Sequence, residues 1–258
     1  MPSFHGKFIW YELLTTDMPA AIAFYKKVVG WGAHEASGDK NGYTLFTAGD
    51  VEVAGAMPQP AGASGPPPAW LGYVAVDDVD VYAAAVKEAG GTVHHAPMDI
   101  PDVGRIAVVA DPHGAVFGLA KFSIPSLVPH NVGPEAIGYT GWRELMAGDL
   151  DTEFAFYAGL FRWTKAEAHD MGPMGVYQLF ALGGGEAMGG MMTKPAQMPA
   201  PPHWGYYFQV DGINAAIGRI NEAGGKVVNG PMQVPGGLWV VQGQDPQGAY
   251  FALVSPNA

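Results

Sequence analysis

The sequence contains no cysteine among its 258 residues. This absence excludes disulfide bonds, thiolate nucleophiles and sulfur-ligated metals. No apolar run reaches the roughly 20 residues that a membrane-spanning helix needs. The first residues, MPSFHGKFIWYELL, lack a basic region followed by a long apolar core, so a secretory signal is not expected. We therefore expect a cytoplasmic protein without a membrane partner.

Basic residues are scarce: 13 Lys and Arg stand against 24 Asp and Glu, which gives a formal net charge of -11. Nucleic-acid binding requires clustered Lys and Arg that neutralise phosphates, so nucleic acid is not an expected partner. Hydrophobic residues make up 48% of the chain and charged residues 14%, which is the composition of an ordinary globular protein. A chain of this length is expected to form two domains, each with a sizeable core.

One stretch of the sequence occurs twice. It runs from Trp10 to Trp31 as WYELLTTDMPAAIAFYKKVVGW and returns from Trp142 to Trp163 as WRELMAGDLDTEFAFYAGLFRW. Each copy predicts an apolar strand followed by a capped helix, with Thr16 or Asp17 as the cap in the first copy. Further matches follow in the same order to near the C-terminus, including an EAGG sequence and a DP turn. The two halves are therefore predicted to be a duplication.

Each half is itself predicted to contain two β-α-β-β-β units. In the first half, the second unit begins with the strand LGYVAV and the capped helix DDVDVYAAAVKEAGG. Three strands follow, and the last two are joined by a DPHG turn. A segment rich in proline and glycine, residues 58–69, separates the first unit from the second. The chain is thus expected to contain four such units.

In the first unit, a strand is followed by the motif D-x-x-x-A-x-x-F-Y and then by G-W. In the second unit, a strand is followed by D-D and E-A-G-G, and the unit ends with a D-P-x-G turn before its last strand. Together they resemble the vicinal oxygen chelate superfamily, which includes glyoxalase I, extradiol dioxygenases and bleomycin-resistance proteins. The resemblance covers nearly the whole chain. It implies an α+β fold of tandem glyoxalase-like modules, in which the four units form two curved-sheet cups.

The resemblance also implies where the modules begin and end. The expected boundaries are residues 1–124 for the first module, 125–137 for a linker and 138–258 for the second module. Because each half resembles a complete subunit of the dimeric members, we expect a monomeric pseudo-dimer or a weak homodimer.

Metal-using members of this superfamily chelate a divalent ion with His or Glu at fixed strand positions. The resemblance assigns these positions to side chains that do not bind metals, namely Trp10, Leu71, Gly118, Trp142, Gly205 and Ala252. The residues therefore predict no metal ligand set and no cofactor. A divalent metal held in another way is left open, through His5, His34 or His169 together with Glu12 or Glu144.

Glu12 and Glu144 occupy the same place in the two copies, two residues after Trp10 and Trp142. Strand alternation places each Glu on the same face as its Trp, and we expect that face to line the cup. A carboxylate in an apolar strand suits a general base that removes a proton next to a carbonyl. The alternative is that each carboxylate only accepts hydrogen bonds that hold the core together.

The remaining lining of the cups is expected to be apolar and aromatic, which suits an adaptable pocket for a flat ligand. The predicted ligand-binding residues are Trp10, Trp142, Tyr73, Tyr207, Gln209, Met57, Met191 and Trp239.

Three functions are compatible with the sequence. The first is a glyoxalase-like protein that binds a small apolar or aromatic molecule in its cups without the usual metal chelate. The second is a metal-independent lyase or isomerase with Glu12 or Glu144 as the general base. The third is a metal-dependent glyoxalase or extradiol dioxygenase, whose ligand set is missing. The residues favour the first function and leave open whether the protein is an enzyme.

Overall fold

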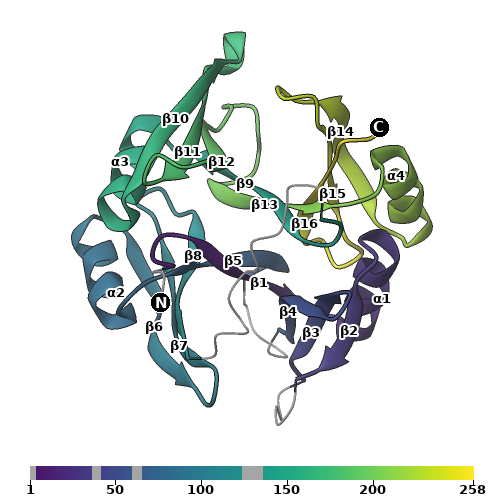
Figure 1. Ribbon diagram of the computed structural model, residues 1–258, viewed down its shortest axis with the longest axis horizontal. Helices are drawn as coiled ribbons and strands as arrows, with labels where there is room; N and C mark the ends of the chain where they lie inside the picture. The colour runs from purple at the N-terminus through teal and green to yellow at the C-terminus, as the bar shows by residue number, and fades with distance from the viewer. Residues whose placement is uncertain (1–3, 37–41, 60–65, 124–135) are drawn as a thin grey trace. The chain divides into compact units, whose positions relative to one another are not determined.

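The computed structural model describes residues 4–36, 42–59, 66–123 and 136–258. In the first half, the elements are β1 Phe8–Thr15, α1 Met18–Val28, β2 Gly32–Glu35, β3 Thr44–Ala48, β4 Val51–Pro58, β5 Ala69–Ala75, α2 Val79–Glu88, β6 Thr92–Ile100, β7 Gly104–Ala110 and β8 Val116–Phe122. In the second half, they are β9 Thr140–Ala147, α3 Leu150–Phe161, β10 Trp163–Asp170, the short 3-10 helix Gly172–Met174, β11 Val176–Leu182, β12 Ala187–Thr193, β13 His203–Gln209, α4 Ile213–Glu222, β14 Lys226–Gln233, β15 Trp239–Gln244 and β16 Tyr250–Ser255. Four β-α-β-β-β units therefore follow one another along the chain, as predicted (Figure 1).

Each half of the chain forms one eight-stranded curved sheet. The strand order is β2-β3-β4-β1-β5-β8-β7-β6 in the first and β10-β11-β12-β9-β13-β16-β15-β14 in the second. Within a unit, the first strand runs parallel to the last, as β1 does with β4 and β9 with β12. The three strands after each helix pair antiparallel as hairpins. The predicted α+β fold of tandem modules is confirmed. Most of the expected linker, up to residue 135, lies outside the described residues.

Local sequence determines where the helices begin and end. The Asp17 side chain caps α1 by accepting a backbone N–H three residues later at 3.0 Å, and Asp149 caps α3 in the same way at 2.9 Å. After α1, Gly30 adopts a left-handed conformation with φ of 88°. Its counterpart after α3 is Arg162, with φ of 59°. A side chain in this conformation costs about 1–2 kcal/mol, so the two copies end their helices at different energetic cost.

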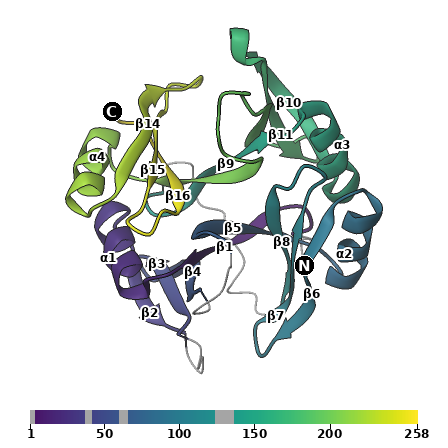
Figure 2. The ribbon, with the colours of Figure 1, turned by 180° about the vertical axis from the view of Figure 1, so that it is seen from behind.

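The described residues group into two compact units. The α1–α4 unit consists of residues 10–36, 42–59, 66–71, 136–142 and 205–258, and the α2–α3 unit of residues 4–9, 72–123 and 143–204. Helices α1 and α4 lie side by side in one unit, and α2 and α3 in the other (Figures 1 and 2). Each compact unit therefore combines one β-α-β-β-β unit from each half, an arrangement that the sequence left open.

Aromatic residues of the duplicated stretch form the cores of these units. In the α1–α4 unit, the rings of Tyr25 and Trp31 lie 5.8 Å apart, and both are buried. The equivalent pair in the α2–α3 unit is Tyr157 and Trp163, stacked at 5.2 Å. Burial of such side chains stabilises a fold by about 1.5–3 kcal/mol each, so the repeated F-Y and W positions account for much of the packing energy.

A hydrogen-bonded chain crosses the core of the α1–α4 unit. The Trp70 indole Nε1 donates to the Tyr25 hydroxyl at 2.8 Å, and that hydroxyl donates to Asp245 Oδ2 at 3.1 Å. Asp245 Oδ1 accepts the backbone N–H groups of Gln247 and Ala249 at 3.0 and 2.9 Å. Burial raises the pKa of Tyr25 well above its ordinary value, so the hydroxyl stays protonated as the donor. The D-P turn is thereby fastened to α1.

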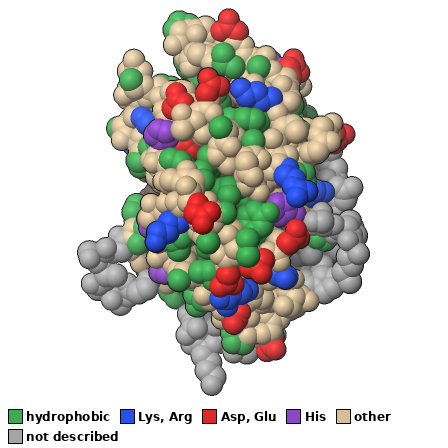
Figure 3. All heavy atoms as spheres, turned by 90° about the vertical axis from the view of Figure 1, so that its left-hand side faces the viewer, with side chains coloured by type: hydrophobic (Ala, Val, Ile, Leu, Met, Phe, Trp, Pro, Cys, Tyr) green, Lys and Arg blue, Asp and Glu red, His purple; other side chains and the backbone are tan. Residues whose placement is uncertain are grey.

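Among the described residues, the helices are all too short or too polar to span a membrane. Acidic, basic and hydrophobic side chains are intermixed on the face that Figure 3 shows. In the α2–α3 unit, Lys165 Nζ lies 3.3 Å from Asp151 Oδ1, and Arg105 Nε lies 2.7 Å from Asp80 Oδ2. Exposed ion pairs of this kind contribute about 0–1 kcal/mol each, so the stability of the fold rests mainly on the aromatic cores.

Candidate functional site

Strand β1 alternates between two environments. Leu13 is fully buried, and Tyr11 packs against Tyr206 with ring centroids 5.2 Å apart. Glu12 points to the other face of the strand, together with Trp10. The carboxylate therefore lies away from the side chains of the aromatic core and beside a tryptophan, on the face that the sequence analysis assigned to it.

Tyr43 reaches Glu12 across strand β4. Its hydroxyl donates a hydrogen bond to Glu12 Oε1 at 2.9 Å and accepts one from Trp10 Nε1 at 2.9 Å. Gly55 is the β4 residue that pairs with Glu12, and a Cβ atom there would lie 1.9 Å from the Tyr43 hydroxyl oxygen. Because real Cβ contacts are never that short, this glycine lets the tyrosine lie over the strand.

The second half repeats this arrangement. The Tyr177 hydroxyl donates to Glu144 Oε1 at 3.0 Å. Gly190 pairs with Glu144 in the sheet, and a Cβ there would lie 2.3 Å from the Tyr177 ring. Each predicted glutamate thus belongs to a Tyr–Glu pair that is accommodated by a glycine. Sequence reasoning missed both tyrosines, although Tyr43 and Tyr177 stand at the repeat spacing of 134 residues.

The methionines near these pairs lie on two different faces. Met57 pairs with Leu14, which shares the face of Glu12. The equivalent place in the second half belongs to Met192. Met191, the residue proposed from the sequence, points to the opposite face and is fully buried. Met192, one position further along β12, is therefore the methionine on the face that carries Glu144.

A second polar arrangement lies on β13 and β15. The Tyr207 hydroxyl accepts a hydrogen bond from Gln242 Nε2 at 2.7 Å. Tyr207 also belongs to a buried apolar cluster, against which half-buried hydrophobic residues pack. The other buried members are Val240, Ala252 and Val254, and the half-buried residues are Trp142, Met232 and Val234. Gln209 lies two residues after Tyr207 on the same strand face. Trp239 alternates with Val240 along β15 and so points to the opposite face.

Tyr73 has a counterpart arrangement in the α2–α3 unit. It lies beside Gly118 in the pairing of β5 with β8, and a Cβ on that glycine would lie 2.1 Å from the ring. At the corresponding place in the second half, Ala252 pairs with Tyr207. Tyr73 therefore lies beside a glycine of the neighbouring strand, whereas Tyr207 lies beside an alanine.

Within the α1–α4 unit, the predicted site residues fall into two groups. Trp10, Glu12 and Met57 share one face of β1 and β4. Trp142 and Tyr207 pack in the apolar cluster of β13, β15 and β16. Each group combines apolar or aromatic surface with at least one hydrogen-bonding side chain, which is the mixture found in small-molecule sites.

A metal chelate does not fit the donor atoms of these faces. The described residues contain no group of three or more His, Asp or Glu side chains placed to hold a metal ion. The strand positions that the family resemblance assigns to ligands carry tryptophan, leucine, glycine and alanine. Of the histidines left open as ligands, His34 lies 3.5 Å from Glu52, His169 lies 3.8 Å from Glu167, and His5 faces a tyrosine hydroxyl of α2 at 3.2 Å.

Comparison with known sequences places this chain among described families. The family model of the "Glyoxalase/Bleomycin resistance protein/Dioxygenase superfamily" matches residues 7–119 and 136–253. The chain is 35% identical over 255 residues to CFP32 of Mycobacterium tuberculosis, which is named as a provisional glyoxylase; the match covers 96% of this chain and 94% of the relative. It is 32% identical over 261 residues to the anthracycline biosynthesis protein DnrV of Streptomyces peucetius, covering 95% and 91% of the two chains.

Comparison with solved structures gives the same fold. The Mn(II)-bound glyoxalase from Novosphingobium aromaticivorans aligns with a TM-score of 0.66 at 16% identity, over 99% of this chain and 84% of the other. The 2,3-dioxygenase LapB from Pseudomonas sp. KL28 aligns with a TM-score of 0.67 at 13% identity, over 100% and 94% of the two chains. At these identities the likeness is one of fold alone.

Proposed function

Because the chain belongs to the glyoxalase/bleomycin resistance protein/dioxygenase superfamily, we propose that it binds a small apolar or aromatic molecule on the strand faces that carry Glu12 and Glu144. The proposal rests on one observation: each half holds a carboxylate against a tyrosine hydroxyl, at 2.9 Å for Tyr43 and 3.0 Å for Tyr177, on a face shared with tryptophan or methionine. A polar pair on an otherwise apolar surface orients a ligand that carries a hydroxyl or carbonyl group.

The chemistry of the surrounding side chains supports an aromatic ligand. Half-buried Met57 shares the Glu12 face and half-buried Trp142 shares the Glu144 face, and methionine and tryptophan offer large, polarisable contact surfaces to flat rings. A relative with 32% identity is named for anthracycline biosynthesis, which makes an anthracycline a suitable first probe. The metal chelate of many superfamily members is not part of this proposal, since the donor atoms for it are missing from the equivalent strand positions.

Calorimetric titration and thermal-shift measurements with an anthracycline and a library of aromatic and cationic compounds test this function. We expect at least one compound to stabilise the wild-type protein. Glu12→Gln and Glu144→Gln each remove a charged hydrogen-bond acceptor worth about 1.5–3 kcal/mol, so binding at the altered face should weaken by about 10- to 100-fold. Glu88→Gln, an exposed change at the end of α2, is the matched control and should bind as the wild type does.

Two results would contradict the proposal. The first is a flat thermal-shift response across the whole library. The second is unchanged affinity for an identified ligand in the double variant Glu12→Gln, Glu144→Gln. Stoichiometric iron, nickel or zinc in the purified protein would show instead that a ligand set exists elsewhere in the chain.

A metal-independent lyase or isomerase is the second candidate function. It is favoured by the direct contact between a carboxylate and a phenol hydroxyl, since proton abstraction next to a carbonyl uses a base and a nearby donor. The same variants distinguish it from binding alone. Incubation of α-hydroxycarbonyl compounds in D2O should then give deuterium exchange at carbon, and the double variant should abolish the exchange while the fold stays intact.

A further inference from the structure

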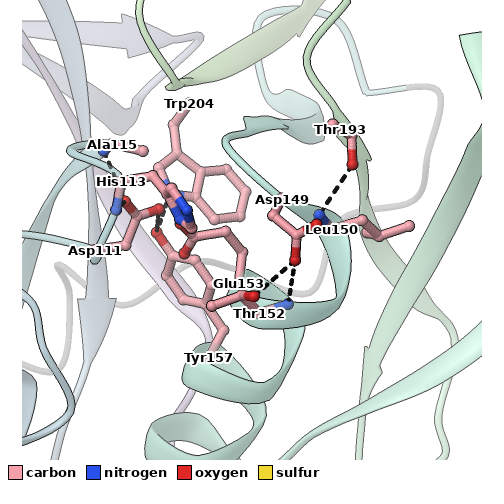
Figure 4. A network of polar contacts seen from close by, with 10 residues as sticks. All are labelled: Asp111, His113, Ala115, Asp149, Leu150, Thr152, Glu153, Tyr157, Thr193 and Trp204. Carbon is pink, nitrogen blue, oxygen red and sulfur yellow. Dashed lines mark hydrogen bonds and ion pairs between the residues drawn. The ribbon is translucent and has the colours of Figure 1, made fainter.

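The two compact units differ at one place in their cores. The α2–α3 unit has its own buried chain, in which Trp204 Nε1 donates to the Tyr157 hydroxyl at 2.9 Å and that hydroxyl donates to Asp111 Oδ2 at 3.0 Å (Figure 4). It matches the chain that crosses the α1–α4 unit. The α2–α3 unit adds Glu153 and His113 to this chain.

In the α1–α4 unit, the repeat-equivalent positions of Glu153 and His113 are held by Ala21 and Gln247. Ala21 is fully buried, so a small apolar side chain fills the site in one unit and a carboxyl group fills it in the other. The duplication therefore supplies a natural reference for what the additional pair does.

Glu153 is enclosed on all sides. Its side chain is 0% exposed, and its Oε1 contacts the Nδ1 atom of His113, whose ring is 37% exposed. Oε2 is buried and meets no hydrogen-bond donor among the described residues. An ionised Glu153 would thus leave one charged oxygen without a donor, which is costly in a protein interior.

The neighbouring carboxylate makes ionisation of Glu153 more costly still. Asp111 accepts three hydrogen bonds, from the backbone N–H groups of Ala115 and His113 at 2.8 and 3.1 Å and from the Tyr157 hydroxyl at 3.0 Å. These donors fix Asp111 as an acceptor beside Glu153. A second negative charge next to it would be repelled in a medium of low dielectric constant.

We propose that Glu153, His113 and Asp111 form a buried proton-binding site, which holds a proton at neutral pH and so ties the turn between β7 and β8 to helix α3. The titratable groups that face Glu153 are Asp111 and His113 from the turn, Asp149 at the N-cap of α3 and Tyr157 within α3 (Figure 4). The site goes beyond ligand binding at the Glu12 and Glu144 faces and does not depend on it.

The proton has a definite effect on stability. Burial, and then the negative charge of Asp111, raise the pKa of Glu153 from 4.5 to about 9. Because the folded state binds this proton more tightly than the unfolded chain does, the stabilisation is complete below about pH 4.5 and is lost as the pH rises through about 9. Opening of α3 away from the turn should become easier by up to tenfold for each pH unit between these values.

Hydrogen–deuterium exchange of the full chain between pH 6 and pH 9 tests this site. Amide protection in α3, Leu150–Phe161, is compared with protection in α1, Met18–Val28, after correction for intrinsic exchange rates. Helix α1 is the internal control, because Ala21 replaces the glutamate there. We expect the ratio of α3 to α1 protection to fall by about 10- to 1,000-fold over this range.

Two variants make the result decisive. Glu153→Gln keeps the shape of the protonated side chain and should make the protection ratio independent of pH. The double variant Glu153→Ala, His113→Gln reproduces the residues of the α1–α4 unit and should do the same, which covers the case that glutamine is poorly tolerated. A ratio that stays constant with pH in the wild type, or that falls equally in the variants, would overturn the proposal.

Discussion

Replacement of Tyr25 by phenylalanine removes a single oxygen atom from the core of the α1–α4 unit. That oxygen accepts the indole N–H of Trp70 at 2.8 Å and donates to Asp245 Oδ2 at 3.1 Å. The ring itself stays, with its contacts to Trp31 and Phe46 at 5.8 and 6.0 Å. The variant therefore isolates the contribution of the hydrogen-bonded chain from that of aromatic packing.

The expected cost follows from the groups left behind. Tyr25 is 0% exposed, so water does not replace its hydroxyl. The lost hydrogen bond to the Asp245 carboxylate is worth about 1.5–3 kcal/mol, and a buried indole N–H without an acceptor costs about 1–3 kcal/mol. Tyr25→Phe should therefore lower the free energy of unfolding by about 2.5–6 kcal/mol. Tyr157→Phe should have a similar cost, because its hydroxyl makes the equivalent pair of hydrogen bonds, to Trp204 at 2.9 Å and to Asp111 at 3.0 Å.

Urea unfolding followed by tryptophan fluorescence and circular dichroism measures this cost. Tyr250→Phe is the control, since that hydroxyl lies on a side chain that is 55% exposed and its removal should change stability by less than about 0.5 kcal/mol. The double variant Tyr25→Phe, Trp70→Phe should cost less than the sum of the single changes, because both remove the same interaction. A loss below about 1 kcal/mol for Tyr25→Phe would refute this account of the core.

Two further changes test local geometry. Gly55→Ala places a Cβ atom 1.9 Å from the Tyr43 hydroxyl oxygen. The change should displace the tyrosine from Glu12 and weaken ligand binding as much as Tyr43→Phe does. Unchanged titration curves would count against the proposed site. Arg162→Gly relieves a left-handed backbone conformation, which the equivalent residue of the other copy, Gly30, adopts without strain. The change should raise the melting temperature by about 1–4 °C in a thermal scan. An equal or lower melting temperature would show that Arg162 is not strained.

The fold could be predicted because its signals are local and occur twice. The duplicated stretch from Trp10 to Trp31 contains the strand, the Asp17 cap and the aromatic residues of the core within 22 consecutive positions. Strand alternation then placed Glu12 on the face of Trp10, since the side-chain period of a strand is two residues. These features need no knowledge of which strands pair.

The partners of Glu12 were missed because they depend on strand pairing. Tyr43 lies 31 residues from Glu12 and reaches it only across β4, at the one position where a glycine leaves room. The choice of Met191 over Met192 has a related cause. A spacing of 134 residues maps Met57 onto Met191, whereas the parallel register of β12 with β9 places Met192 there. One inserted residue exchanges the two faces of a strand.

The Glu153 site was hidden for a different reason. In the sequence, Glu153 is an acidic residue in the first turn of a helix, a position that the helix dipole favours and that is usually exposed. Its burial arises from the turn of Asp111 and His113, which belongs to the other half of the chain. Since the sequence did not reveal which units pack together, it gave no reason to place these three residues in one core.

This site also bears on the equivalence of the two Tyr–Glu pairs. Glu144 lies on β9, and the chain turns a corner at Gly148 between this strand and α3. A Cβ atom on Gly148 would lie 2.3 Å from the His113 ring, so the ring packs directly on this corner. The first backbone N–H of α3 is bound by Thr193 of β12, the strand that pairs with β9. The corner between Glu144 and Glu153 is thus held from both sides. In the α1–α4 unit, Gln247 and Ala21 stand in place of His113 and Glu153, so the proposed proton site has no counterpart in that unit. The two Tyr–Glu pairs share one hydrogen bond, at 2.9 and 3.0 Å, but the helix that follows Glu144 carries a carboxyl–imidazole contact where the helix that follows Glu12 has an alanine.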